Sequence, residues 1–119
     1  MTNYLIMKIN IFTTDTFAKE YKRLKKKYKS LKDDLTLFKE ELSKNPQAGT
    51  DLGNGIRKVR IAISSKNKGK SGGARIITYN VIVSISERNI ILVTIYDKSN
   101  TETISDSVIK QIIKNNPIE

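Results

Sequence analysis

Residues 74–96, ARIITYNVIVSISERNIILVTIY, decide the fold of this chain. Two runs dense in β-branched residues, 74–83 and 90–96, flank the polar stretch 86–89 (SERN). β-Branched side chains suit a pleated, half-buried surface, and a short polar break between two such runs is typical of an antiparallel hairpin. The sequence therefore predicts a β-hairpin around which the rest of the chain packs.

Further strands are predicted on the N-terminal side of this hairpin. Within residues 56–64, Val59, Ile61 and Ile63 alternate with Lys58, Arg60 and Ala62, and the same period of two recurs over residues 5–11. Such a period places the apolar side chains on one face of a sheet. The intervening stretch 46–55, PQAGTDLGNG, is rich in turn residues and is expected to be a loop.

A single apolar stripe with alternating spacings of four and three indicates helix between the first two strands. Its members are Phe17, Tyr21, Leu24, Tyr28, Leu31, Leu35, Phe38 and Leu42. Ser30 with Asp33 three residues later is a helix-start signal in the middle of the stripe. We therefore expect two helices, 14–29 and 31–44, folded as a hairpin, although one continuous coiled coil would show the same stripe.

A short amphipathic helix after Ser105 completes the predicted order β-α-α-β-β-β-α. Its apolar residues are Ile104, Val108, Ile109, Ile112 and Ile113. This order predicts an α+β domain, in which a small, mostly antiparallel β-sheet carries the helices on one face. Residues 1–119 are expected to form one domain, with residues 1–6 as an N-terminal extension if Met7 is the true start.

The composition of the chain limits which partners it can bind and which reactions it can catalyse. The formal charge of +10 and the pI near 9.8 favour a polyanionic partner such as nucleic acid, anionic membrane or an acidic protein, although lysines that only solubilise the surface would give the same charge. The chain has no cysteine and no histidine, so disulfides, thiolate metal sites and histidine acid–base catalysis are excluded. We expect no metal and no other cofactor. The apolar runs are too short to cross a bilayer and no signal-peptide cleavage site is evident, so a cytoplasmic protein is expected.

The loop of residues 66–73, KNKGKSGG, raises the question of a nucleotide site, because residues 69–71 look like the end of a phosphate-binding loop. That loop type needs a glycine where this chain has Ser64, and it leads into a helix, whereas a strand follows here. A nucleotide site is therefore not expected. A mobile hairpin connection and a contact for nucleic acid both remain open.

The alternation of side chains along the predicted strands places several basic residues on one face of the sheet. Side chains two residues apart share a face, so one exposed sheet face is expected to carry Lys58, Arg60, Arg75, Tyr96 and Lys98. The loop lysines would lie at its rim: Lys66, Lys68 and Lys70. Basic groups beside tyrosine on an open sheet are suited to a phosphate backbone and a stacked base, and a merely solvated polar face has the same composition.

Three segments resemble the RelE-type toxins of bacterial toxin–antitoxin modules, within the RelE/ParE superfamily: residues 56–60 (IRKVR), 68–75 (KGKSGGAR) and 95–99 (IYDKS). The resemblance extends from Lys8 to about Ile113. It implies the α+β fold described above and a toxin that enters the ribosomal A site and cuts mRNA there. It also implies a small acidic antitoxin that blocks the toxin, and contact with operator DNA only through the antitoxin complex.

The resemblance also implies site residues. Arg75 corresponds to the strand arginine that contacts the scissile phosphate, and Lys58, Tyr96 and Lys98 to further catalytic groups. Contacts with RNA are expected from Arg60, Lys66, Lys68 and Lys70, and from the helix lysines Lys25, Lys26 and Lys29. Some family members use a tyrosine in the C-terminal helix or a histidine near the end, and this chain has neither.

Without metal or histidine, RNA can still be cut by its own 2′-hydroxyl, which attacks the adjacent phosphorus. The protein must then align the attacking oxygen, move protons and stabilise the added negative charge.

Two rival interpretations of the function remain. One is a ParE-like poison of DNA gyrase without nuclease activity, against which the basic 68–75 motif argues. The other is a helical interaction module that uses only the stripe of residues 17–42, against which the strong strands from Ile56 onward argue.

Overall fold

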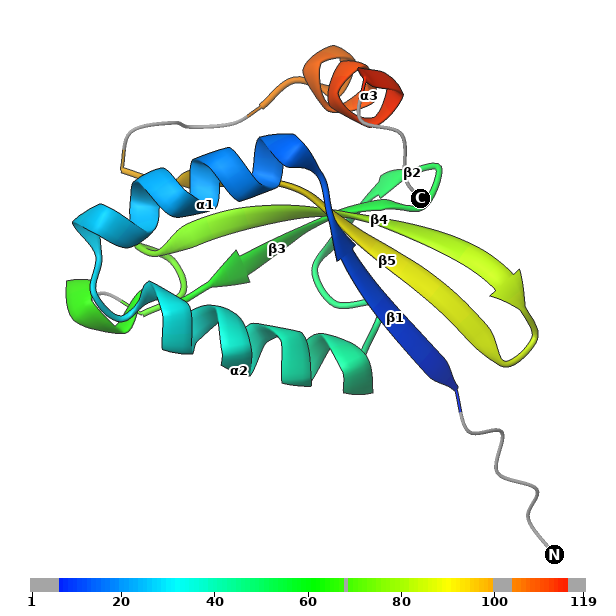
Figure 1. Ribbon diagram of the computed structural model, residues 1–119, viewed down its shortest axis with the longest axis horizontal. Coiled ribbons are helices and arrows are strands. Elements are labelled where there is room, and N and C mark those ends of the chain that lie inside the picture. The colour runs from blue at the N-terminus through cyan, green and yellow to red at the C-terminus, as the bar shows by residue number, and fades with distance from the viewer. Residues whose placement is uncertain (1–6, 68, 100–103, 116–119) are drawn as a thin grey trace, which may run out of the picture.

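The predicted hairpin lies at the centre of a five-stranded sheet in the computed structural model, which describes residues 7–67, 69–99 and 104–115. Strand β4 (Ala74–Ser84) pairs antiparallel with β5 (Glu87–Asp97). Ser84 pairs with Glu87, so the turn consists of residues 85–86 and is shorter than the predicted stretch 86–89. Residues 87–89 instead extend β5 beside the neighbouring strand (Figure 1).

The sheet order is β1-β5-β4-β3-β2. Strand β1 (Lys8–Thr13) runs parallel to β5, and β3 (Ile56–Ile61) runs antiparallel to β4. The α+β class with a mostly antiparallel sheet is thereby confirmed. The predicted first strand began at residue 5, and residues 1–6 lie outside the described residues.

The prediction of an unbroken loop over residues 46–55 is wrong, because it contains strand β2 (Thr50–Gly53), which pairs with β3. The turn between them is Asn54-Gly55, with φ angles of +55° and +81°. Two successive residues with positive φ match the twist of an antiparallel pair, and Asn-Gly is the dipeptide that adopts them most readily. This signal was present in the sequence and marks the hairpin.

Three α-helices occur in the described part of the chain: α1 (Asp15–Lys27), α2 (Leu31–Lys44) and α3 (Asp106–Asn115). One turn of 3-10 helix, η1 (Ser64–Lys66), follows β3. The α1–α2 hairpin is confirmed, and the Thr14 hydroxyl caps α1 by accepting from the Phe17 backbone N–H at 2.9 Å. None of the helices in the described residues is long and apolar enough to cross a membrane.

Two separate cores lie on the two faces of the sheet. The stripe of α1 and α2 packs on one face, where Phe17, Leu31 and Leu42 are almost completely buried. Helix α3 covers the other face through Ile109, and in Figure 1 it lies apart from the α1–α2 hairpin. The expectation that every helix packs on one face is therefore wrong for α3. The second face needed a cover because Ile77 and other apolar side chains also point to it.

A β-bulge explains why the second face was misassigned along β5. Thr78 pairs with Leu92 and Ile77 pairs with Thr94, so Val93 is an extra residue in β5. One extra residue reverses the alternation that follows it. Tyr96 therefore shares the α3-side core with Val93, and the prediction that these two side chains face opposite ways is wrong.

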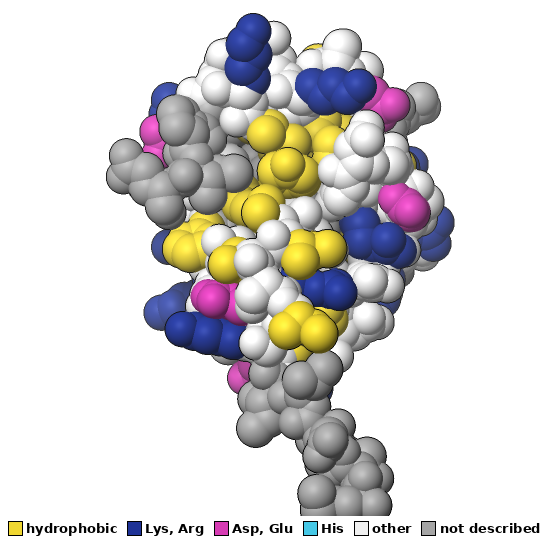
Figure 2. Space-filling model, turned by 90° about the vertical axis from the view of Figure 1, so that its right-hand side faces the viewer, with side chains coloured by type: hydrophobic (Ala, Val, Ile, Leu, Met, Phe, Trp, Pro, Cys, Tyr) yellow, Lys and Arg dark blue, Asp and Glu magenta, His cyan; other side chains and the backbone are white. Residues whose placement is uncertain are grey.

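The two ends of the β4–β5 hairpin differ in character. Around the turn, Ile82, Val83 and Ile85 are 71%, 51% and 78% exposed. Figure 2 looks onto this side of the molecule and shows hydrophobic side chains running down its middle, with Lys and Arg side chains above them and on both sides. The cationic residues of the predicted site gather at the opposite end, where β4 begins and β5 finishes.

Candidate nucleic-acid interface

Pairing across three neighbouring strands brings predicted site residues into one row. Arg60 of β3 pairs with Arg75 of β4, and Arg75 pairs with Tyr96 of β5. Lys58 lies two residues along β3, opposite Ile77. Residues that are far apart in sequence are thus neighbours at the end of the sheet where the basic loop enters β4.

This row is not the open face that strand alternation predicts. Arg75 and Tyr96 are each only 6% exposed, because the α3-side core continues up to Tyr96. Arg60 is exposed, and Lys58 and Lys98 are half-buried. The site therefore has a buried floor with cations at its edge, rather than a flat exposed platform.

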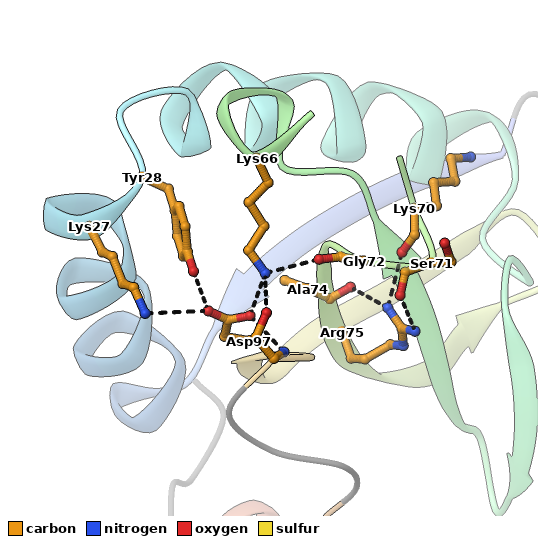
Figure 3. Close-up of polar contacts among 10 residues, drawn as sticks. Lys27, Tyr28, Lys66, Lys70, Ser71, Gly72, Ala74, Arg75 and Asp97 are labelled. Atoms are coloured by element: carbon orange, nitrogen blue, oxygen red, sulfur yellow. Dashed lines mark hydrogen bonds and ion pairs between the residues drawn. The ribbon is translucent and has the colours of Figure 1, made fainter. Parts of the chain in front are cut away.

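Arg75 binds the basic loop from below (Figure 3). Its Nη1 atom donates to the Lys70 carbonyl at 3.1 Å and to the Ala74 carbonyl at 3.2 Å, and Nη2 donates to the Ser71 carbonyl at 3.2 Å. Arginine has five N–H donors, so these three bonds leave up to two for a further acceptor. The guanidinium is consequently held in a fixed orientation within the row.

Lys66 is turned inward, so the prediction that it lies free at the rim is wrong. Its ammonium donates to an Asp97 carboxylate oxygen at 2.6 Å, to the Gly72 carbonyl at 2.9 Å and to the Ser99 hydroxyl at 2.8 Å. Only 8% of the side chain is exposed. An ammonium has three hydrogens, and the protein itself accepts all three, which leaves none for RNA.

Asp97 is the residue at the centre of this network, and sequence reasoning missed it. The Tyr28 phenol donates to Asp97 at 2.5 Å, the Ser99 backbone N–H donates at 2.9 Å, and the Lys27 ammonium lies 3.9 Å away. Asp97 is 3% exposed and ends β5 within the IYDKS segment. An acidic residue inside a motif read only for its tyrosine and lysine was the available signal.

Electrostatics around Asp97 favour the charged carboxylate. Burial alone would raise the pKa of Asp97, but the hydrogen bonds from Lys66 and Tyr28 outweigh it and hold that pKa well below its usual range. Burial, the hydrogen bond to Asp97 and the charge of Asp97 raise the pKa of the Tyr28 phenol from 10.0 to about 12. The carboxylate is therefore ionised, and the phenol protonated, throughout the physiological range.

The outward-facing cations line a groove between α2 and the end of β3, with a volume of about 250 Å³. Lys58, Arg60 and Lys70 line it, and its apolar lining includes Phe38 and Val59. A smaller groove of about 110 Å³ adjoins it and shares Arg60, Lys70 and Phe38. Glu41 lines both grooves and Asp34 lines the smaller one, so the basic lining has two acidic neighbours.

The remaining predicted contacts are spread more widely. Lys98 follows the last residue of β5, and its backbone N–H donates to the Gly73 carbonyl at 3.1 Å. Lys25, Lys26 and Lys29 are exposed at the end of α1 and in the turn that follows, and they do not line either groove. Lys68 lies outside the described residues. Within the described ranges, acidic side chains do not cluster in the groups of three that a metal ion would need.

An α+β domain with a cationic groove at one end of its sheet defines a candidate nucleic-acid-binding protein. The family model described as the RelE toxin of the RelE / RelB toxin-antitoxin system matches residues 9–116. The chain therefore belongs to the RelE toxin family, as the segments quoted from its sequence indicate. It is the toxin of a toxin–antitoxin module, and an antitoxin is its family partner. A ParE-like function is not favoured.

Proposed function

We propose that this toxin is a ribosome-dependent mRNA endoribonuclease that stops translation. The observation that carries the proposal is the row Arg60–Arg75–Tyr96 beside the groove lined by Lys58 and Lys70. Cations at a groove attract the RNA backbone, and an arginine fixed in a buried floor presents its donors without reorganisation when charge develops on a phosphate.

The proposed reaction is attack by the RNA 2′-hydroxyl on the adjacent phosphorus. The 2′-oxygen forms a bond to phosphorus, the bond to the 5′-oxygen breaks, and the products carry a 2′,3′-cyclic phosphate and a 5′-hydroxyl. One proton leaves the 2′-hydroxyl and one reaches the departing 5′-oxygen, so protons balance. Lys58, Tyr96 and Lys98 are the candidates for these transfers, and Arg75 for stabilising the charge on phosphate.

The burial of Tyr96 bears on its role. A ring that is 6% exposed offers little surface on which a base could stack. This argues against a stacking platform and in favour of a contribution from the hydroxyl. Phenylalanine separates the two roles, because it keeps the ring and removes the hydroxyl: we expect Tyr96→Phe to slow cleavage about as much as Tyr96→Ala.

The direct test compares naked mRNA with the same mRNA in a translating ribosome. We expect the purified toxin to leave naked mRNA largely intact and to cut it on the ribosome, with a cyclic phosphate at the new 3′ end. The Arg88→Ala variant is a matched control, since Arg88 lies near the other end of β5. Equal cutting with and without ribosomes would refute ribosome dependence, and gyrase inhibition without cutting would refute the nuclease.

A further inference from the structure

Three segments that are distant in sequence meet at the Asp97 carboxylate. Tyr28 follows α1, Lys66 ends η1, and Asp97 ends β5 (Figure 3). The sequence separations are 69 residues for the Tyr28 bond and 31 for the Lys66 bond. The Lys66 ammonium also lies 5.1 Å from the centre of the Tyr28 ring, which adds a cation–π contact. We call these three residues the clasp.

The clasp reaches the basic loop through Lys66. Lys66 donates to the carbonyl of Gly72, and Arg75 donates to those of Lys70 and Ser71. Three successive carbonyls of the loop thus accept from two buried cations. Next to them, a side chain on Gly73 would collide with the Ile61 carbonyl, so the loop backbone lies directly against β3. With its carbonyls held inward, the loop keeps the Lys70 side chain exposed at the groove.

Asp97 makes this arrangement stable in a strongly basic chain. A buried ammonium is costly unless a paired anion and hydrogen bonds replace its water. Asp97 supplies the anion, and without it Lys66 would gain by turning outward into water. If Lys66 turned outward, the Gly72 carbonyl would lose the hydrogen bond from the ammonium. The end of the loop that carries Lys70 would then no longer be held in place.

We propose that Asp97 is a positioning residue, which acts through Lys66 to hold the basic loop in the shape that presents Lys70 to RNA. Its effect on cutting rests on the proposed nuclease function. Its effect on the loop does not, so the two can fail separately. In this arrangement one of the toxin's lysines serves to place another.

The first measurement is the rate at which trypsin cuts after Lys70 in the native protein. We expect Asp97→Asn and Lys66→Met each to speed this cut about tenfold, the factor that loss of one charge-assisted hydrogen bond implies. The control is Phe17→Leu or Phe17→Val, whichever matches the loss of thermal stability, because Phe17 is buried in the core near the start of α1, whereas Tyr28 of the clasp follows the end of that helix. Equal cutting in the control, or no change in the clasp variants, would overturn the proposal.

The second measurement is single-turnover cleavage on translating ribosomes. We expect Asp97→Asn to raise the half-saturating toxin concentration about tenfold while the maximal rate stays within about twofold, since a misplaced loop weakens binding rather than chemistry. The double variant with Lys66→Met should be no worse than either single variant, because both break one interaction. A loss confined to the maximal rate, or fully additive losses, would contradict positioning through Lys66.

If the parent protein cuts no RNA with or without ribosomes, the proposed nuclease function fails. The trypsin measurement still tests whether Asp97 and Lys66 hold the loop in place. A filter-binding measurement with a single-stranded RNA oligonucleotide supplies the missing functional readout. A weaker affinity in Asp97→Asn than in the matched Phe17 variant would support the clasp, and equal affinities would overturn its link to RNA.

Discussion

Lys66 and Lys70 belong to the same loop, four positions apart, yet they occupy opposite environments. The Lys66 side chain is 8% exposed and gives all three ammonium hydrogens to the protein, whereas Lys70 is exposed at the groove. Arg75 belongs with Lys66, so we call these two the inward cations. Among the predicted site residues, the outward cations are Lys58, Arg60 and Lys70 at the groove, and Lys25, Lys26 and Lys29 at the end of α1.

The difference between the two groups shows that the number of basic residues overstates the binding surface. The 22 lysines and arginines of the chain include the inward cations, although these donate to loop carbonyls and to Asp97. Inward cations build the loop, and outward cations are free to meet a polyanion.

Arg75 is the strictest test, because it is inward and is also proposed to stabilise the phosphate. Removing one preorganised donor from a developing negative charge costs about 10²–10³-fold in rate. We therefore expect Arg75→Ala to abolish growth arrest on induction while circular dichroism shows the fold retained. Arg88→Ala should stay toxic. A folded, fully toxic Arg75→Ala protein would make Arg75 purely a builder of the loop.

Substitution of one lysine from each group, Lys66 and Lys70, is expected to change the unfolding free energy by different amounts. Lys66→Met leaves the buried Asp97 without its main partner, and breaking a buried ion pair in this way costs about 3–5 kcal/mol of unfolding free energy. Lys70→Met removes an exposed charge and should change the unfolding free energy by less than about 0.5 kcal/mol. Urea denaturation at neutral pH measures both. Similar losses in the two variants would erase the distinction between inward and outward cations.

The pH dependence of stability tests the contribution of Tyr28 to the clasp. The folded pKa of Tyr28 is raised from 10.0 to about 12, so its contribution is complete below pH 10 and is lost as pH rises to 12. Tyr28→Phe should lose less stability across that window than the parent. Part of the alkaline loss should remain, because burial and the charge of Asp33 raise the pKa of Tyr21 as well.

The lowered pKa of Asp97 makes stability depend on pH in the opposite direction, with the loss at acidic pH. Its folded pKa is depressed, so its contribution is complete above about pH 4, the range of an unfolded aspartate, and is lost as pH falls further. Asp97→Asn should therefore show a shallower fall of the urea midpoint below pH 4 than the parent does. Parallel curves for parent and variant would contradict the clasp.

The outward lysines of α1 should show the smallest effect. Replacing Lys25, Lys26 and Lys29 by glutamine should leave stability within about 0.5 kcal/mol for each residue. If each meets a phosphate, the slope of log affinity against log salt for single-stranded RNA should fall by about 0.7 per lysine. An unchanged slope would mean that these lysines only solubilise the helix.

Local pattern was enough for much of the fold. The period of two predicted β1 and β3, and the runs dense in β-branched residues predicted β4 and the apolar part of β5. The helical stripe, with its helix-start signal at Ser30, predicted two helices instead of one. These features depend on neighbours along the chain, because alternation and helical spacing act within one element. Strand β2 was missed because TDLG has no apolar alternation, and its place depends on pairing with β3.

The sequence by itself thus determined the α+β class, the family and the cluster of cations around the basic loop. Only the tertiary structure decided which cations turn inward. That choice depends on a bulge at Val93, which resets the faces of β5, and on Asp97, which meets Lys66 across 31 residues. The physical reason is that a lysine has the same helix, strand and charge preferences wherever it stands, whereas its burial depends on an anion brought to it by distant parts of the chain.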